Sequence, residues 1–375
     1  MSLALNMIVG SNESYELNRC LESAVLPGIF DEIVIVVTTH DQEVEKVARK
    51  FTDKVFYFEW IKDFSAARNY ALFNTKSEYV MWLDADDIIN EISQTNMPNM
   101  KKYVLQGQCD RYLCPYYIDV NINGEFLQHG LVPRFFKNTK KLRWNKRVHE
   151  QIMETDTKWM PRTGTFIGFS VEHRPLKITK TGVLRNIEIL REEYDKDPTD
   201  HHYAFYLARD CMLIGESDEA LKIFDHIIKK RIGTPDHLYT AAFFIAQHYT
   251  YASDGSLKTD NLGTAETYAR IAMSFSEKYA EPYVILGDVY YHRGDLGNAE
   301  ACWKRAMNKS LNGYSAQEVA YYEEIPSVKL ANLYVQRNDY TSIEQALYYN
   351  KIALKHRPHD SILLNNRKTL IGLLK

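Results

Sequence analysis

Three carboxylates lie within four positions of the chain, directly after an apolar run. They are Asp84, Asp86 and Asp87, and the run before them is Tyr79-Val-Met-Trp-Leu83. Carboxylates this close repel one another unless a cation relieves them. Oxygen atoms spaced as Asp-x-Asp suit a hard divalent ion such as Mg2+ or Mn2+, which can in turn hold the phosphates of a substrate. The alternative is an acidic turn that only caps the next element, because Asp is a common helix N-cap.

The elements around this turn follow an α/β pattern. Residues 79–83 are typical of a buried strand in a parallel sheet, and residues 4–9 and 33–37 have the same character. Residues 17–25 and 43–51 have helical spacing, which gives the order strand, helix, strand, helix. Right-handed crossovers then build a parallel sheet. The acidic turn falls at the carboxyl end of a strand, where open α/β sheets bind ligands.

The pattern changes beyond Pro175, where Tyr, Ala and Leu recur at helical spacing. Residues 280–306 resemble a tetratricopeptide repeat, and weaker copies precede and follow them. A non-repeating helical bundle is the alternative. We therefore expect an α/β domain over residues 1–178 and an all-α helical repeat domain over residues 179–375, whose surface binds or dimerises. Small residues are expected to let two helices of the best copy approach closely: Gly287, Ala299 and Ala306.

Composition narrows the class of protein. The chain has 375 residues, 45% of them hydrophobic and 25% charged, as in an ordinary globular protein of two domains. A net charge of −3 gives no global attraction to nucleic acid or to an anionic membrane. No apolar run approaches the roughly 20 residues of a membrane span, and the first residues do not resemble a secretory signal, so we expect a cytoplasmic protein. Five scattered cysteines without a Cys-x-x-Cys pair indicate neither disulfides nor zinc.

Four motifs of the first half, taken together, resemble a known family. They are Ile8-Val-Gly-Ser-Asn12-Glu13, Asp63-Phe-Ser-Ala-Ala-Arg68-Asn69, Trp82-Leu-Asp84-Ala-Asp86-Asp87 and Arg147-Val-His-Glu150. They resemble the motifs of family 2 glycosyltransferases, which have the GT-A fold, a Rossmann-like fold of nucleotide-diphospho-sugar transferases. The resemblance covers roughly residues 5–175. The whole chain is similar in layout to the branch with helical repeats behind the catalytic domain, and within it to the peptide S-glycosyltransferases of glycocin bacteriocins.

The resemblance implies a donor side that binds a nucleotide sugar, expected to be a UDP-sugar, through Mn2+ or Mg2+. Asn12 and Glu13 would line the nucleoside pocket. Asp86 would be a metal ligand, with Asp84 near the ribose or the metal. Related enzymes often add a late histidine, here His173, which would return to the sheet edge after an expected strand over residues 165–171; a structural histidine is the alternative. A metal on the donor diphosphate would neutralise charge on the leaving group.

The resemblance also implies an acceptor side. Inverting transfer needs a carboxylate that takes the acceptor proton, and Glu150 is the candidate base, with His149 orienting it or lining the site. The same resemblance places Asp63 and Arg68 on the donor side. Asp63 or Ser65 can cap a helix that presents Arg68, whose guanidinium matches either a diphosphate or the acidic turn.

Val37 limits the predicted specificity for uracil, and a basic stretch between residues 134 and 147 allows further binding roles. Family members usually have an Asp where Val37 stands, so reading of uracil is open, and Asp41 could substitute after a shift. A basic stretch without one acid could hold a diphosphate, form a lid or attract an anionic acceptor such as DNA, or be a solvated surface: Arg134, Lys137, Lys140, Lys141, Arg143, Lys146 and Arg147.

The acceptor is expected to be a peptide or protein, with a glycan precursor or DNA as alternatives, and homodimerisation through the helical half is a further expectation. A non-catalytic repeat protein with a retired transferase domain is a different class of function. A sugar nucleotidyltransferase would need a Gly-rich, Arg-bearing loop after the first strand, which residues 9–13 do not provide.

Overall fold

The chain folds into two compact units in a computed structural model that describes residues 1–120, 126–176, 180–310 and 317–374. The units are Met1–Ile189 and Leu190–Lys375. The predicted boundary between residues 178 and 179 lies outside the described residues. Within the described part of the chain, none of the helices has the length and apolar character needed to cross a bilayer.

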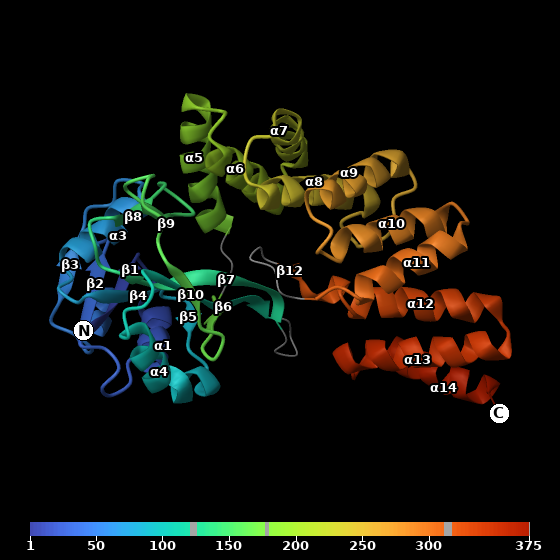
Figure 1. The fold of residues 1–375 in the computed structure, drawn as a ribbon, viewed down its shortest axis with the longest axis horizontal. Helices are drawn as coiled ribbons and strands as arrows, with labels where there is room; N and C mark the ends of the chain where they lie inside the picture. The colour runs from blue at the N-terminus through green and yellow to red at the C-terminus, as the bar shows by residue number, and fades with distance from the viewer. Residues whose placement is uncertain (121–125, 177–179, 311–316, 375) are drawn as a thin grey trace. The chain divides into compact units, whose positions relative to one another are not determined.

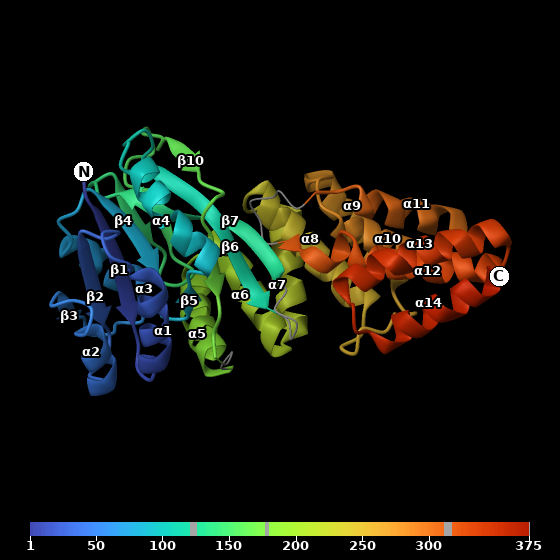
Figure 2. The same cartoon turned by 90° about the horizontal axis from the view of Figure 1, so that it is seen from below.

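A mixed sheet forms the centre of the first unit, with the strand order β3-β2-β1-β4-β7-β6-β11-β5 (Figure 1, Figure 2). The first four strands in this order are mutually parallel, as predicted: β3 (Val55–Tyr57), β2 (Glu32–Val37), β1 (Leu3–Val9) and β4 (Tyr79–Leu83). The remainder was not predicted: β7 (Phe126–Lys137), β6 (Arg111–Val120), β11 (Val171–His173) and β5 (Asp87–Ile88). Because β6 and β7 form an antiparallel hairpin and β7 pairs antiparallel with β4, the sheet is mixed.

Helices cover both faces of this sheet because each strand alternates its side chains between them. On one face, Leu3 and Leu5 of β1 share a buried cluster with residues of three helices, α1 (Ser14–Ala24), α2 (Gln42–Ala48) and α4 (Glu91–Val104). On the other face, Ala4 and Val80 pack with α3 (Phe64–Phe73) and with a separate hairpin of β8 (Leu142–Asn145) and β9 (Gln151–Glu154). The carboxyl ends of β1, β2 and β4 therefore open onto the same edge.

Two sequence-based element assignments were wrong. The helix expected over residues 43–51 ends at Ala48. The strand expected over residues 165–171 is instead two short strands, β10 (Thr163–Thr165) and β11, with non-strand residues between them. Its apolar residues suggested a strand, but Phe169 is buried in the core and the Oγ of Ser93 accepts from the backbone N–H of Ser170, which takes that group out of any ladder.

The described residues of the second unit are predominantly helical, as predicted, with the short strand β12 (Gln317–Glu318) among them. Successive helices pack in antiparallel pairs, α6 with α7, α8 with α9, α10 with α11 and α12 with α13, which agrees with a repeat rather than with an irregular bundle. The bounds are α6 (His201–Ile214), α7 (Ser217–Lys230), α8 (Pro235–Thr250), α9 (Leu262–Phe275), α10 (Glu281–His292), α11 (Leu296–Met307), α12 (Glu324–Arg337), α13 (Tyr340–His356) and α14 (Ser361–Leu373). Helix α5 (Lys180–Lys196) contributes residues to both units.

Close approach within the pair α10–α11 depends on a glycine. A Cβ added to Gly287 would lie 2.3 Å from Nε1 of Trp303 and 2.5 Å from its Cδ1. The same indole N–H donates to Oδ1 of buried Asp288 over 3.1 Å, which fixes the ring against the glycine. The prediction that Gly287 lets the helices approach is confirmed.

We therefore expect Gly287→Ala to lower the stability of the helical unit by about 1–3 kcal/mol, the usual cost of overpacking. The matched control is Gly263→Ala in α9, where an added Cβ meets no atom within 4 Å and should be neutral or slightly stabilising. Thermal unfolding followed by far-UV circular dichroism measures both. Equal midpoints for the two variants would contradict the close contact.

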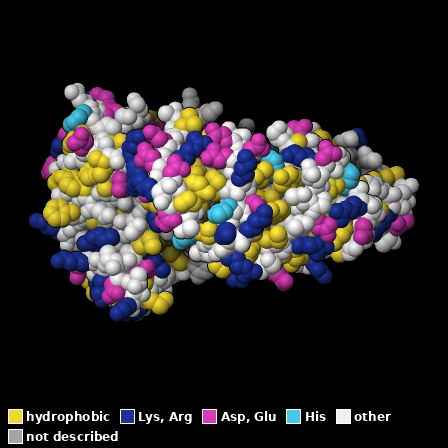
Figure 3. All heavy atoms as spheres, turned by 90° about the horizontal axis from the view of Figure 1, so that it is seen from above, with side chains coloured by type: hydrophobic (Ala, Val, Ile, Leu, Met, Phe, Trp, Pro, Cys, Tyr) yellow, Lys and Arg dark blue, Asp and Glu magenta, His cyan; other side chains and the backbone are white. Residues whose placement is uncertain are grey.

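On the face seen in Figure 3, basic and acidic side chains are interspersed, as the small net charge leads one to expect.

Candidate active site

The three aspartates of the acidic turn have different surroundings, although they are adjacent in sequence. Asp87 is fully buried and pairs with the equally buried Arg134 of β7, with 2.8 Å between Oδ2 and Nη1. The hydroxyl of Tyr116 donates to Oδ1 over 3.0 Å, and the backbone N–H of Asp84 donates to Oδ2 over 2.9 Å. Burial alone would raise the pKa of Asp87, but Arg134 outweighs it and the pKa lies below its ordinary value. Asp87 is thus bound on both oxygens.

Arg134 differs from its neighbours in the basic stretch. Its guanidinium carbon lies 3.9 Å from the ring centroid of Trp82 and 4.2 Å from that of Tyr116, inside the sheet layer. The expectation of a solvated or ligand-binding basic surface is therefore wrong for this residue. Register explains its place, because Phe135 and Phe136 of β7 pair with Met81 and Val80 of β4 and bring Arg134 beside the end of β4.

Arg68 joins the donor-side and acceptor-side carboxylates. Asp63 caps α3 by accepting the backbone N–H of Ala66 over 2.9 Å, so α3 starts where its first turns carry Arg68 to the sheet edge. Nη2 of Arg68 donates to Oδ1 of Asp84 over 2.6 Å, and Nε donates to Oε1 of Glu150 over 2.5 Å. Of the two partners considered for Arg68, the structure shows the acidic turn.

Two tryptophans hold this guanidinium in place. Its carbon lies 4.7 Å from the ring of Trp82 and 4.8 Å from the ring of Trp144, and the two rings meet edge to face. Asn69, the next residue of α3, fixes Trp144 by bonding both to its backbone N–H and to its carbonyl. Arg68 is therefore a rigid link between Asp84 and Glu150.

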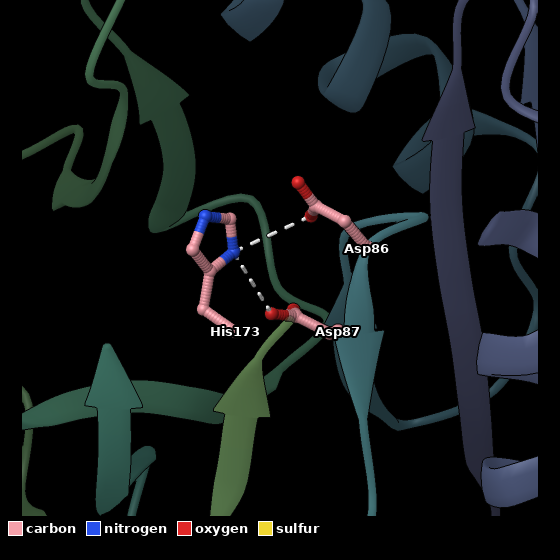
Figure 4. A group of neighbouring side chains, drawn as sticks. All are labelled: Asp86, Asp87 and His173. Atoms are coloured by element: carbon pink, nitrogen blue, oxygen red, sulfur yellow. Dashed lines mark ion pairs between the residues drawn. The ribbon is translucent and has the colours of Figure 1, made fainter. Parts of the chain in front are cut away.

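Asp86 faces His173 at the same edge. Nδ1 of His173 lies 3.5 Å from Oδ1 of Asp86 and 3.9 Å from Oδ1 of Asp87 (Figure 4). The register of β11 against β5 places His173 opposite Asp87, so the contact is fixed by strand pairing. Within the described residues, Nδ1 is buried without a hydrogen bond of normal geometry, and these three side chains could together hold a metal ion. One nitrogen and carboxylate oxygens suit Mn2+ or Mg2+.

The negative charges of Asp86 and Asp87 favour a positive charge beside them, either on His173 or on a metal ion. Burial lowers the pKa of His173, but the carboxylates of Asp86 and Asp87 outweigh burial and raise it to about 10. The imidazole is therefore protonated at neutral pH without a metal, and a metal that binds Nδ1 must displace this proton. Asp84 is not part of the group, because its Oδ1 is bound to Arg68; burial raises its pKa, with Arg68 opposing.

The β1–α1 loop places Asn12 and Glu13 at the same edge. Asn12 adopts a left-handed conformation with φ of 62°, and its backbone N–H donates to Oδ2 of Asp41 over 2.9 Å. Oδ1 of Asp41 accepts the backbone N–H groups of Glu43 and Val44 as the cap of α2. Both oxygens of Asp41 thus hold backbone. Glu13 accepts from the N–H of Gly10, and burial together with nearby Asp86 and Asp84 raises its pKa.

Sequence reasoning missed the roles of three residues. Trp82 and Trp144 were read as a strand residue and as part of a basic stretch, yet they enclose Arg68. Arg134 gave one signal, a single cation within the apolar run Val132-Pro-Arg-Phe-Phe136, which is typical of a buried, paired arginine.

The surroundings of the two aspartates predict that replacing Asp87 lowers the stability of the first unit, whereas replacing Asp86 leaves it nearly unchanged. Asp87→Ala leaves Arg134 buried without a counter-charge and should destabilise the first unit by about 3–5 kcal/mol. Asp86→Ala, at a partly exposed residue, should cost less than about 1 kcal/mol. Urea unfolding followed by tryptophan fluorescence reports on this unit, since Trp303 alone among the five tryptophans lies in the other. Equal losses in the two variants would refute the division.

Comparisons with known proteins agree with the motifs. The family model described as Glycosyl transferase family 2 matches residues 8–170. The SPbeta prophage-derived glycosyltransferase SunS of Bacillus subtilis (strain 168) is 23% identical over 222 residues, which is 57% of this chain and 50% of SunS. A TPR repeat-containing protein of Synechococcus elongatus is 28% identical over 155 residues, 40% of this chain and 35% of that protein. The chain thus spans half the length or less of these curated relatives.

Among solved structures, S. aureus TarS aligns with 83% of this chain and 93% of its own, at 12% identity and a TM-score of 0.31. A similarity this low does not assign a role to any residue of the site. The family model matches residues 8–170, a little under half of the chain, and confirms the expected resemblance to family 2 glycosyltransferases over this range.

Proposed function

We propose that this protein is a metal-dependent inverting glycosyltransferase that moves a sugar from a nucleotide-diphosphate donor, a UDP-sugar, to a peptide or protein. The observation that carries the proposal is one sheet edge of a family 2 domain where Asp86 and His173 are poised for a metal and Arg68 holds Glu150 beside them. The name of the relative SunS, a glycosyltransferase, supports the same class of reaction.

On the donor side, Asp86 and His173 would hold Mn2+ or Mg2+, which supplies Lewis-acid stabilisation of the diphosphate leaving group when bound. Asn12 and Glu13 would line the nucleoside pocket, and Asp84 would lie next to the ribose or the metal, with Arg68 fixing its orientation. Because Val37 stands where an Asp is usual and both oxygens of Asp41 bind backbone, any reading of uracil must come from other groups.

On the acceptor side, Glu150 would act as the base. Within the described part of the chain, its Oε1 accepts from Arg68 and no donor is bound to Oε2, which leaves that oxygen for the acceptor proton. As the acceptor attacks the anomeric carbon, Oε2 takes this proton and the bond to the diphosphate oxygen breaks on the opposite face, which inverts the centre. Arg68 keeps the carboxylate aligned for this role.

A non-catalytic repeat protein with a retired transferase domain is the alternative class. The observation against it is the completeness of the site, since Asp86, His173, Arg68 and Glu150 all meet at one edge. A glycan precursor or DNA stays an alternative acceptor, and homodimerisation and a cytoplasmic location stay predictions.

Asp86→Ala tests the metal role. In the presence of Mn2+ we expect transfer to the acceptor, or donor hydrolysis, to fall at least about 10²-fold, because the variant lacks a ligand of the metal that would stabilise the leaving group. The measurement is UDP release over a panel of UDP-sugars, with thermal shift for binding. The control is Asp53→Ala, an exposed aspartate of the same unit. Full activity of the Asp86 variant, or a wild-type protein that binds no nucleotide sugar with Mn2+, would show the proposal wrong.

Glu150→Gln tests the base. Gln retains an oxygen that accepts from Arg68, so the fold and donor binding should persist, while turnover should fall at least about 10²-fold because the amide takes no proton. Steady-state kinetics separate kcat from KM. Glu154→Gln, in the same β8–β9 hairpin and paired with Arg111, is the control. Unchanged kcat in the Glu150 variant would eliminate the role.

A further inference from the structure

One arginine of the first unit faces the acidic site without a carboxylate partner. Arg185 lies in the first half of α5, and within the described residues its hydrogen-bond partner is the side chain of the adjacent Asn186, 3.3 Å from Nη2. Glu13 and Glu150 attract its charge but form no ion pair with it. Its side chain is exposed to solvent and is therefore accessible to a ligand.

The start of α3 fixes where this cation lies. The guanidinium carbon of Arg185 is 4.8 Å from the ring centroid of Phe64, the first residue of α3. Glu188, one turn further along α5, bonds Nζ of Lys62 over 2.5 Å. The backbone N–H of Phe64 donates to the carbonyl of Arg147, in the motif that ends at Glu150. Arg185 thus lies against the start of the helix that carries Arg68, and this helix start is in turn bonded to the segment that ends at Glu150.

The other two arginines described at the site, Arg68 and Arg134, are already paired with carboxylates. Arg68 bonds Asp84 and Glu150, and Arg134 is paired with Asp87 below the surface. Although Arg185 is exposed as a residue, packing around part of its guanidinium lowers its pKa, while the charges of Glu13 and Glu150 oppose this. A ligand that brings negative charge would therefore gain a charge-assisted contact here.

We propose that Arg185 binds the diphosphate of the nucleotide donor and stabilises it as the leaving group, an inference that rests on the proposed function. A guanidinium fork matches two phosphate oxygens, and the ring of Phe64 lies 4.8 Å from the guanidinium carbon. During transfer the acceptor forms its bond to the anomeric carbon, the bond from that carbon to the diphosphate breaks, and the electron pair stays on the diphosphate oxygen. Glu150 takes the acceptor proton, and the N–H groups of Arg185 donate to the departing diphosphate.

The alternative role for Arg185 is a counter-charge that only balances Glu13 and Glu150. The two roles differ in what they affect. A counter-charge would change stability or the binding of every ligand alike, whereas a diphosphate ligand would discriminate between nucleosides with and without phosphates.

The test is isothermal titration calorimetry of the full chain in Mn2+ with UDP and with uridine. In Arg185→Gln we expect UDP to bind about tenfold more weakly or worse, as for loss of a hydrogen bond between charged groups, with uridine affinity unchanged. Arg185→Lys should recover part of the affinity. Arg49→Gln, an exposed arginine of the same unit, is the control. Circular dichroism confirms that each variant is folded.

The outcomes separate this inference from the proposed function. If wild-type protein binds UDP and Arg185→Gln binds it equally well, the inference is overturned and the proposed donor stands. An equal loss of UDP and uridine affinity also overturns it in favour of a structural role. If wild-type protein binds no UDP with Mn2+, the proposed donor fails and the inference fails with it.

Discussion

The carboxylates of Asp87 and Glu150 can be buried at one sheet edge, next to partly exposed Asp84, only because Arg68 and Arg134 are buried with them. Removing a charge from water is costly, and a buried pair is tolerated only with good geometry and satisfied hydrogen bonds. Arg68 meets that condition through Asp84 and Glu150. Arg134 meets it in part: Nη1 donates to Asp87, whereas Nε and Nη2 have no hydrogen-bond partner among the described residues and the guanidinium lies against the rings of Trp82 and Tyr116. The two sets of ion pairs connect β4, β5, β7 and the start of α3. The other side chains of the site are positioned by these connected elements.

Neighbouring residues of the acidic turn therefore have different roles. Asp87 and Arg134 set the shape of the turn, whereas Asp86 and His173, which are partly exposed, face outward with charge that a metal would balance. Arg68 belongs to both groups because it connects a donor-side aspartate with the candidate base. Such a link means that the two halves of the reaction centre cannot move independently without breaking a desolvated ion pair.

Short sequence patterns were enough to predict much of the fold and of the candidate site. The apolar run before Asp84 predicted β4, Asp63 predicted the start of α3, and four motifs together predicted the resemblance to family 2 glycosyltransferases. What failed depended on pairing between distant segments. The antiparallel hairpin β6–β7 carries Arg134 to Asp87 across 47 positions, and no local pattern specifies that register. Residues 166–170 were predicted to be part of a strand because they are largely apolar, but Phe166 and Phe169 pack into the core while Ile167 is exposed. Arg185 lies in an amphipathic helix with no motif around it.

The buried pair also has a consequence for how relatives of this chain can be interpreted. Loss of either partner alone strands a charge, so Asp87 and Arg134 can change only together, and selection for folding preserves them whether or not the protein still acts on a sugar. Asp86 is partly exposed and pairs with no arginine among the described residues, so it has no such constraint, whereas Glu150 shares buried Arg68 with Asp84. A relative that has lost the activity should therefore keep Asp87 and Arg134 and vary first at Asp86.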